Sequence, residues 1–216
     1  MLRFVLGAGL FVPILVALIA ACSPAAGSAD PHAHHSAAAA PEAQGTVQRA
    51  LVVLSDAPML DQTGAVRRLK SDIAEGRIIV VDFIFTSCQT ICPVTTALMA
   101  DGHRRLSDIS GDDLAFISMS VDARTDTPAR LAAFAARHGA EWSFLTGEKP
   151  VMDEALTWLN AYAIVPEDHT AMIVIGDTAT GEFSRIYGLP DPAVIEGRVR
   201  ALMARRQAAP AVLHQH

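Results

Sequence analysis

Cysteine is scarce in this chain, with three residues among 216, at positions 22, 88 and 92. Small secreted scaffolds that depend on disulfides carry several bridges, so the sequence excludes that class of protein. A bond between Cys88 and Cys92 would close a very short loop and would contribute little stability through chain entropy. The cysteines therefore indicate redox or metal chemistry rather than scaffolding.

Basic residues are also few. Lysine and arginine number 17 against 23 aspartate and glutamate residues, the formal net charge is −6, and no stretch gathers basic side chains. We therefore do not expect nucleic acid as a partner. No internal repeat is found, and residues 46–206 have the length of one domain with a normal core.

The N-terminus has the pattern of an export signal. Arg3 precedes the apolar run Phe4–Ala20, which is short for a spanning helix, and Ile19–Cys22 matches a lipobox. This predicts a signal peptide over residues 1–21 and a lipid-modified Cys22, as in a bacterial lipoprotein. An uncleaved membrane anchor is the alternative, and both readings place the rest of the chain in an exported, oxidising compartment.

Residues 22–45 are rich in alanine, proline and histidine without periodicity, which is typical of a flexible tether. The body of the protein then covers residues 46–206, and a tail covers 207–216. Both ends carry histidines, which could collect Cu(II) or Zn(II) transiently or simply form solvated polar segments. These histidines are His32, His34, His35, His214 and His216.

Cys88 and Cys92 follow the apolar strand candidate Ile78–Phe85 and open a helical stretch that extends to about Leu106. The unpaired N–H groups and the dipole at a helix N-terminus favour a thiolate. A strand, a turn with two sulfurs and a helix suit either thiol–disulfide exchange or capture of a soft metal ion.

Strands and helices alternate after the cysteines, which predicts an α/β fold with a mixed central sheet flanked by helices. This is the order of a thioredoxin-like domain. We expect an N-terminal hairpin from residues 51–54 and 64–69, and a helix capped by Thr127 with Pro128 at its first position. The remaining expected elements are strands 114–121, 170–175 and 182–187, the apolar segment 142–145 and helices 149–161 and 191–205.

Four ordered segments resemble the Sco/SenC family of copper-delivery proteins. The first is FIFTSCQTICP at 83–93, with the Cys-x-x-x-Cys-Pro pattern, and the second is SVDARTDTP at 120–128. The third and fourth are WSFLTG at 142–147 and DHT at 168–170. The likeness covers about Leu51 to Ala204.

The resemblance implies that Cys88, Cys92 and His169 bind copper. Thiolates favour Cu(I), and an added imidazole lets the same site hold Cu(II). In the family the acidic motif lies close to the metal, so Asp122 or Asp126 could orient His169 or neighbour Cu(II). The alternative is that Asp126 assists the helix cap at Thr127.

Two further histidines, His103 and His138, fall in helical stretches, where we expect them to face solvent. They are therefore not candidate ligands.

The first functional hypothesis is a copper metallochaperone on the periplasmic side of a bacterial membrane, anchored by the lipid on Cys22. The resemblance implies that its recipient is the copper-site subunit of a respiratory oxidase, or else another exported cuproprotein. A metallochaperone turns over no substrate, so this hypothesis does not make the chain an enzyme. Ser23 carries no inner-membrane retention signal, whereas an oxidase lies in the inner membrane, so the choice of membrane stays open.

The second hypothesis is a thiol–disulfide oxidoreductase that reduces the cysteines of the copper-site apoprotein. Cys88 or Cys92 would then be the attacking thiolate. A reductase does not need His169, and its presence favours copper. The two roles can coexist, because metal binding requires reduced cysteines.

Overall fold

The computed structural model describes residues 46–109 and 111–208. The predicted signal peptide, the lipidation site and both histidine-bearing ends lie outside the described residues. The residues concerned are Cys22, His32, His34, His35, His214 and His216.

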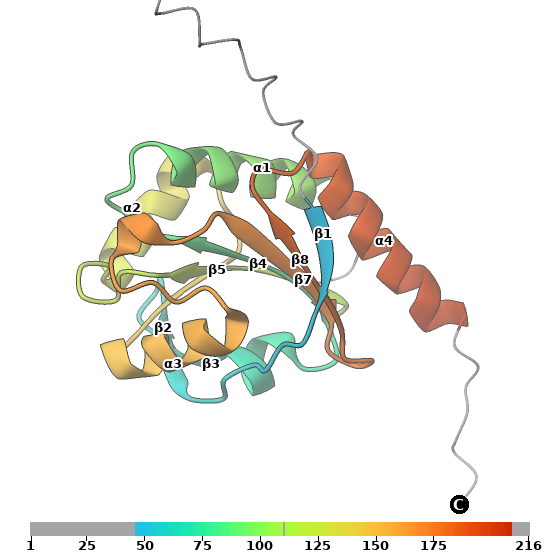
Figure 1. Cartoon of the computed structure of the whole chain (residues 1–216), viewed down its shortest axis with the longest axis horizontal. Helices are drawn as coiled ribbons and strands as arrows, with labels where there is room; N and C mark the ends of the chain where they lie inside the picture. The colour runs from blue at the N-terminus through green and yellow to red at the C-terminus, as the bar shows by residue number, and fades with distance from the viewer. Residues whose placement is uncertain (1–45, 110, 209–216) are drawn as a thin grey trace, which may run out of the picture. The chain divides into compact units, whose positions relative to one another are not determined.

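The described residues form one eight-stranded sheet in the order β1-β8-β7-β4-β5-β6-β2-β3 (Figure 1). Strands β4, β5 and β6 run parallel, and every other pairing is antiparallel. The predicted mixed central sheet is confirmed. The strands are β1 (Thr46–Ala50), β2 (Pro58–Asp61), β3 (Val66–Arg68), β4 (Ile78–Ile84), β5 (Leu114–Ser120), β6 (Ser143–Thr146), β7 (Met172–Asp177) and β8 (Glu182–Tyr187).

The central strands are strongly apolar because helices cover the sheet on both faces. Every residue of β4 and of β7 is buried. A strand buried on both faces has a near-continuous hydrophobic sequence, which explains why Ile78–Ile84 shows no alternation of polar and apolar residues. The core of the fold is centred on these two neighbouring strands.

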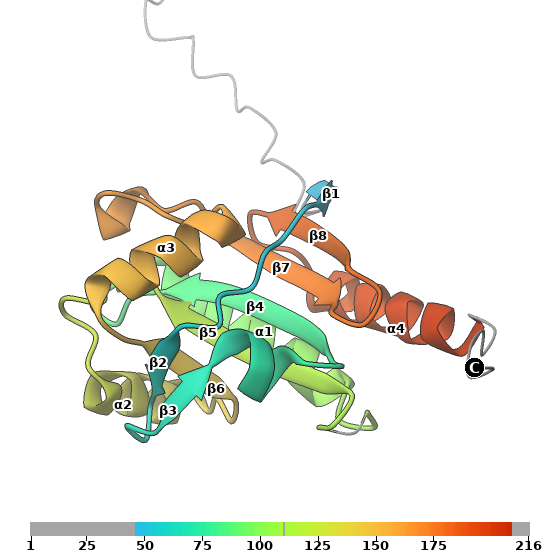
Figure 2. The ribbon, with the colours of Figure 1, turned by 90° about the horizontal axis from the view of Figure 1, so that it is seen from below.

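Four α-helices and two short helical turns connect the strands. The α-helices are α1 (Ile91–Arg105), α2 (Pro128–His138), α3 (Lys149–Leu159) and α4 (Pro192–Ala208), and the turns are η1 (Leu69–Ala74) and η2 (Pro166–Asp168). Helices α1 and α4 lie side by side on one face, with α3 and η1 on the other (Figures 1 and 2). Across the described ranges, none of these helices combines the length and the apolar character needed to cross a membrane.

Successive residues of β8 reach opposite faces of the sheet and show which helix covers each. The Arg198 Nε of α4 donates to Ser184 Oγ at 2.8 Å, whereas Arg185 Nε donates to the carbonyl of Leu159 in α3 at 3.1 Å. This is the alternation expected of a strand. The layers are therefore α1 and α4, then the sheet, then α3.

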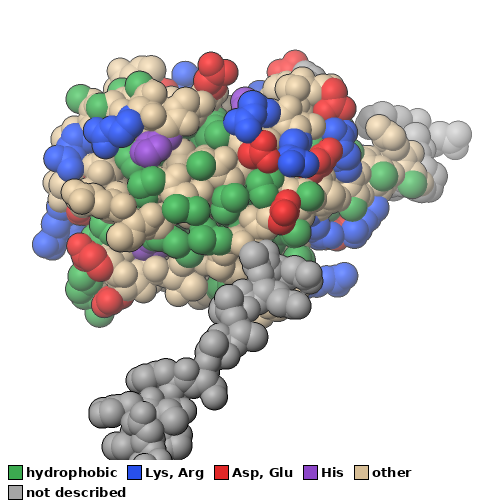
Figure 3. Space-filling model, turned by 90° about the horizontal axis from the view of Figure 1, so that it is seen from above, with side chains coloured by type: hydrophobic (Ala, Val, Ile, Leu, Met, Phe, Trp, Pro, Cys, Tyr) green, Lys and Arg blue, Asp and Glu red, His purple; other side chains and the backbone are tan. Residues whose placement is uncertain are grey.

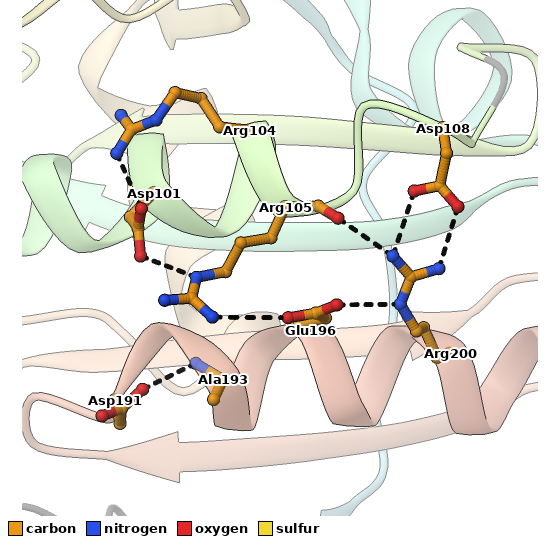
Figure 4. A network of polar contacts seen from close by, with 8 residues as sticks. All are labelled: Asp101, Arg104, Arg105, Asp108, Asp191, Ala193, Glu196 and Arg200. Atoms are coloured by element: carbon orange, nitrogen blue, oxygen red, sulfur yellow. Dashed lines mark hydrogen bonds and ion pairs between the residues drawn. The ribbon is translucent and has the colours of Figure 1, made fainter.

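Helices α1 and α4 are joined by a network of charged side chains (Figure 4). Arg200 of α4 makes two 3.0 Å contacts with Asp108, and its Nε lies 3.0 Å from Glu196. Glu196 in turn contacts Arg105 of α1 at 3.6 Å. These side chains are partly exposed, so solvent screens their attraction and the network adds orientation more than stability.

The cap of α2 agrees with the sequence. The Thr127 hydroxyl accepts a hydrogen bond from the Arg130 N–H at 3.3 Å, and Pro128 occupies the first turn. Gly139 ends the helix in the left-handed conformation, with φ of 62°. The predicted start of this helix is confirmed.

The N-terminal hairpin exists, but its first strand is not the one expected. Strand β2 pairs with β3, whereas residues 51–54 form no strand and Leu51 is 94 % exposed. The Asp61 carboxylate accepts the N–H groups of Thr63 and Ala65 at 2.8 and 3.1 Å. This turn fixes the hairpin between residues 61 and 66, so the paired strands must flank it.

Gly176 provides a test of the sheet packing. A Cβ at this position would lie 1.9 Å from Cδ1 of Phe183, its cross-strand partner. Because the Phe183 ring would have to leave a packed site, we expect Gly176→Ala to lower the free energy of unfolding by about 2 kcal/mol. The measurement is urea unfolding.

The matched control is Gly197→Ala, in α4, where a Cβ meets no atom within 4 Å. This change should raise stability by about 0.8 kcal/mol because alanine favours the helix. Effects of the same sign at both positions would contradict the packing described for β7 and β8.

Candidate metal centre

Strand directions bring three loops to one edge of the sheet. Strands β4 and β5 are parallel, and Ile84 pairs with Ser120, so both strands end at this edge. Strand β7 is antiparallel to β4 and therefore begins there. The loops at residues 85–90, 121–127 and 165–171 consequently emerge together. They carry four of the five predicted site residues of the body, and the fifth, Cys92, lies at the start of α1 directly after the first loop.

The first loop contains a tight turn. The Cys88 N–H donates to the Phe85 carbonyl at 3.1 Å, which closes a turn over residues 85–88. Helix α1 begins at Ile91, so Cys92 lies in its first turn and Cys88 in the turn that precedes it. The helix therefore starts three residues later than the first cysteine.

The two sulfurs lie together at the start of α1. Thr90 is the N-cap residue but makes no side-chain cap hydrogen bond. Instead, the Cys92 N–H donates to Cys88 Sγ at 3.4 Å, so the sulfur satisfies a free N–H of the first turn. Both cysteines are free thiols, and Cys88 is 9 % exposed against 1 % for Cys92.

The two thiols differ in acidity. Burial disfavours the Cys88 thiolate, but hydrogen bonds from Cys92 and Thr90 outweigh it and hold the pKa of Cys88 below its usual value. Deeper burial raises the pKa of Cys92 well above its usual value, and the negative charges of Cys88 and Asp82 act in the same direction. Cys88 is thus the sulfur that ionises first and that solvent reaches.

Asp82 is a site residue that the sequence analysis missed. Its carboxyl is fully buried in β4 and accepts a hydrogen bond from the Ser118 hydroxyl, which itself accepts from Trp142 Nε1 at 2.9 Å. The second oxygen, Oδ2, has no partner among the described residues. Burial raises the pKa of Asp82 to about 7. The signal in the sequence was a single carboxylate within an apolar strand.

His169 follows the short turn η2, at the start of the loop into β7. Its Nδ1 lies 2.8 Å from the Pro166 carbonyl, and a carbonyl only accepts, so Nδ1 carries the proton. This leaves Nε2 with a lone pair that can bind a metal. The ring packs edge-on against Phe85, with centroids 5.7 Å apart and planes at 85°. His169 therefore contacts the residue that opens the cysteine turn.

The structure brings Cys88 and Cys92 together and places His169 beside their loop. Within residues 46–109 and 111–208, no three histidine, cysteine or acidic side chains are close enough to one another to form a ligand set. The donor chemistry nevertheless suits a soft metal, because two adjacent thiols and an imidazole with a free Nε2 are the groups that bind Cu(I) and Cu(II). The three predicted ligands remain a prediction.

The two acidic residues of the second loop have different surroundings. Asp126 is buried, and its carboxylate accepts from the backbone and hydroxyl of Thr86 and from the Ser120 hydroxyl. Burial raises the pKa of Asp126, against these hydrogen bonds. Asp122 is half-buried and closes the turn before Asp126. The cap of α2 comes from Thr127, so Asp126 does not serve as its capping side chain.

The expectation that His103 and His138 face solvent is wrong. His103 packs against the Phe116 and Trp142 rings at 5.0 and 5.7 Å, and His138 against Phe134 at 4.5 Å. Both are half-buried. The neighbours of His103 come from other elements, so its position in a helix does not reveal them, whereas Phe134 lies one turn before His138 in α2.

The surface over α1 has a distinctive distribution of side chains. Figure 3 looks onto α1 and shows hydrophobic side chains in the middle of this face, with charged side chains on both sides of them. Val94, two residues after Cys92, is 45 % exposed. The start of α1 therefore presents apolar surface next to the dithiol.

A thioredoxin-like sheet with a free dithiol at the start of a helix defines a class of thiol-based redox and metal-binding proteins. The sequence model of the SCO1/SenC family matches residues 56–204. The chain belongs to this family.

Relatives support the assignment. The SCO1 protein homolog of Bacillus subtilis (strain 168) is 38 % identical over 104 residues, which are 46 % of this chain and 53 % of the homolog. The chain thus spans about half the length of that curated relative.

Solved structures share the fold. A SCO1/SenC family lipoprotein from Bacillus anthracis str. Ames has a TM-score of 0.62 and 25 % identity, covering 72 % of this chain and 98 % of its own. BsSco, described as a cytochrome c oxidase assembly protein with a disulfide switch, has a TM-score of 0.59 and 29 % identity, covering 73 % and 98 %. Copper-bound ScoI from Arabidopsis thaliana, at 17 % identity, has a TM-score of 0.62 and covers 72 % and 99 %. The predicted thioredoxin-like fold is confirmed.

The raised pKa of Asp82 can be tested through the pH dependence of the protein's stability. Its pKa of about 7 in the folded protein exceeds the ordinary value near 4, so the folded state binds more protons between these pH values. Stability attributable to Asp82 should therefore fall as pH rises from about 4 to 7. Relative to wild type, Asp82→Asn should gain up to about 4 kcal/mol of unfolding free energy between pH 4 and pH 8.

The measurement is urea unfolding of both proteins at the two pH values under reducing conditions. Each protein is compared with itself, which cancels the fixed effect of the substitution on packing. A stability difference between variant and wild type that is the same at pH 4 and pH 8 would contradict a buried carboxyl with a raised pKa.

Proposed function

We propose that this protein is an exported copper metallochaperone that binds one copper ion through Cys88, Cys92 and His169. The observation that carries the proposal is the pair of adjacent free thiols at the start of α1, with a histidine beside their loop whose Nδ1 is already engaged. Membership of the SCO1/SenC family supports it. The ion is cargo and not a catalyst.

The donor set explains how both oxidation states could be held. Two thiolates favour Cu(I), and the Nε2 of His169 adds the nitrogen that suits Cu(II). The pKa of Cys88 lies below its usual value, whereas burial raises the pKa of Cys92 well above its own. Copper loading therefore releases protons and is favoured by rising pH.

The recipient in this proposal is the copper site of a respiratory oxidase or of another exported cuproprotein. Two relatives support this: BsSco is described as a member of a family of cytochrome c oxidase assembly proteins, and Arabidopsis thaliana ScoI was solved with copper bound. Transfer would proceed by stepwise ligand exchange, with thiolates and imidazoles of the recipient replacing those of the chaperone. The apolar surface beside Val94 would be covered in such a complex.

The site of action in this proposal is the periplasmic side of a bacterial membrane, with the lipid on Cys22 as anchor. The lipobox at Ile19–Cys22 supports it, and so does the description of the Bacillus anthracis relative as a lipoprotein. The anchor would keep the chaperone at the membrane surface where an oxidase copper site is assembled.

A thiol–disulfide oxidoreductase is the second candidate, and the unequal thiols favour it. The Cys88 thiolate would attack a disulfide of the recipient, forming a mixed disulfide and releasing one recipient thiolate. Cys92 would then attack Cys88 Sγ, releasing the second recipient thiolate and leaving a Cys88–Cys92 disulfide. The disulfide switch named for BsSco supports this candidate.

Copper titration of the reduced, metal-free protein separates the two candidates. Wild type should bind one Cu(II) with sulfur-to-copper charge-transfer absorption. His169→Ala should weaken Cu(II) binding by at least about tenfold, since outer-shell changes alone cost that much. Cu(I) affinity should fall less, because the two sulfurs remain. Absorption and competition with a chelator are the measurements.

The matched control is His103→Ala. His103 lies in α1, about 16 Å of helix beyond Cys92, so its removal should leave copper binding unchanged. Copper affinity that is equal in wild type and His169→Ala, and no better than that of a simple dithiol, would reject the metallochaperone and leave the oxidoreductase.

A further inference from the structure

The turn over residues 85–88, which ends at Cys88, is hydrogen-bonded to a buried carboxylate. This carboxylate is not one of the proposed copper ligands. Asp126 is 2 % exposed and lies in the loop after β5. Its two oxygens each lie 3.1 Å from the Thr86 N–H, and the Thr86 hydroxyl donates to Oδ1. One side chain thus binds both hydrogen-bond donors of Thr86, the N–H and the hydroxyl.

Asp126 is itself fixed by neighbouring strands. The Ser120 hydroxyl, at the end of β5, donates to Oδ2 at 2.7 Å. The Thr146 hydroxyl, at the end of β6, donates to the Asp126 carbonyl at 2.7 Å. Ser120 and Thr146 are buried as well. The carboxylate is therefore fixed relative to the sheet, because its oxygens accept from the buried Ser120 and the half-buried Thr86.

The position of Thr86 gives this contact a consequence for the sulfurs. Thr86 is the second residue of the turn that the Cys88 N–H closes onto the Phe85 carbonyl at 3.1 Å. A turn is defined by the backbone angles of its two central residues, so holding Thr86 holds the direction in which Cys88 leaves the turn. Arg130 Nε also donates to Thr86 Oγ1 at 3.0 Å, which adds a contact from α2.

We propose that the hydrogen-bonded pair Thr86–Asp126 positions Cys88, so that in the reduced protein its sulfur stays at the start of α1. The proposal rests on the proposed function for its purpose, because a preset pair of sulfurs lowers the cost of ordering ligands around a metal. The contacts that define it do not depend on copper. Neither residue belongs to the proposed ligand set of Cys88, Cys92 and His169.

The equilibrium between the dithiol and disulfide forms of the protein tests the role of the Thr86–Asp126 pair in the absence of copper. Oxidised glutathione converts the dithiol to a Cys88–Cys92 disulfide and is itself reduced to two glutathione molecules. Thr86→Val keeps the shape of the side chain but removes the hydroxyl that binds Asp126. At a fixed glutathione ratio, the ratio of disulfide to dithiol protein should rise at least about fivefold, because the dithiol arrangement loses a hydrogen bond that supports it.

Two matched variants separate positioning from general stability. Thr86→Ser restores the hydroxyl and should return the ratio to the wild-type value. Thr178→Val removes a hydroxyl that donates to the Ala74 and Arg77 carbonyls, at the opposite edge of the sheet. It should lower the unfolding midpoint and leave the thiol–disulfide ratio unchanged. If Thr86→Val does not fold, Asp126→Asn replaces it with the same expectation.

A wild-type ratio in Thr86→Val, or an equal shift in Thr178→Val, would overturn the positioning role. The Cu(II) charge-transfer spectrum of each variant distinguishes this failure from failure of the proposed function. Copper binding by wild type with no shift in ratio or spectrum in Thr86→Val rejects the pair alone. A shifted ratio in a protein that binds no copper supports the pair and rejects the metallochaperone.

Discussion

The pairing of β4 with a parallel neighbour on one side and an antiparallel neighbour on the other is the constraint on which the site depends. Because β5 is parallel to β4, the cysteine loop and the acidic loop leave the sheet at the same edge. Because β7 is antiparallel to β4, the histidine loop enters the sheet at that edge. Residues separated by about 80 positions, such as Phe85 and His169, therefore come into contact.

The polar groups at this edge are held by hydrogen bonds rather than by ion pairs. Asp126 accepts from Thr86 and Ser120, and His169 donates to a carbonyl. The charged networks of the protein lie elsewhere, as between α1 and α4 (Figure 4). The pKa of Cys88 depends on other groups: burial raises it, and backbone and side-chain hydrogen bonds from Cys92 and Thr90 lower it. The Asp82 carboxyl is not fully hydrogen-bonded, since one of its buried oxygens has no partner among the described residues.

Much of the fold could be predicted from the sequence because its signals are local. Thr127 with Pro128, and the uninterrupted apolar run at β4, specify a helix start and a central strand without help from the rest of the chain. Strand β1 could not be predicted, because Thr46–Ala50 is mostly exposed and is defined by its pairing with β8, some 140 residues away. The hairpin was misplaced for a related reason: the Asp61 turn decides which residues pair.

The site was predicted in its residue types and not in its connections. The spacing of Cys88 and Cys92 indicated adjacent sulfurs, and the structure places them so. The contact between Thr86 and Asp126 joins residues 40 positions apart, and the coupling of Asp82 to Cys92 depends on burial. Neither follows from spacing along the chain, because each arises only when the strands are paired.

Copper K-edge X-ray absorption of the Cu(II)-loaded protein tests the central claim most directly, because it counts the atoms bound to the metal. The account predicts two sulfur scatterers and one imidazole nitrogen, with the imidazole signal lost in His169→Ala and one sulfur lost in Cys88→Ser. Copper bound only by nitrogen and oxygen, or an imidazole signal unchanged in His169→Ala, would contradict it.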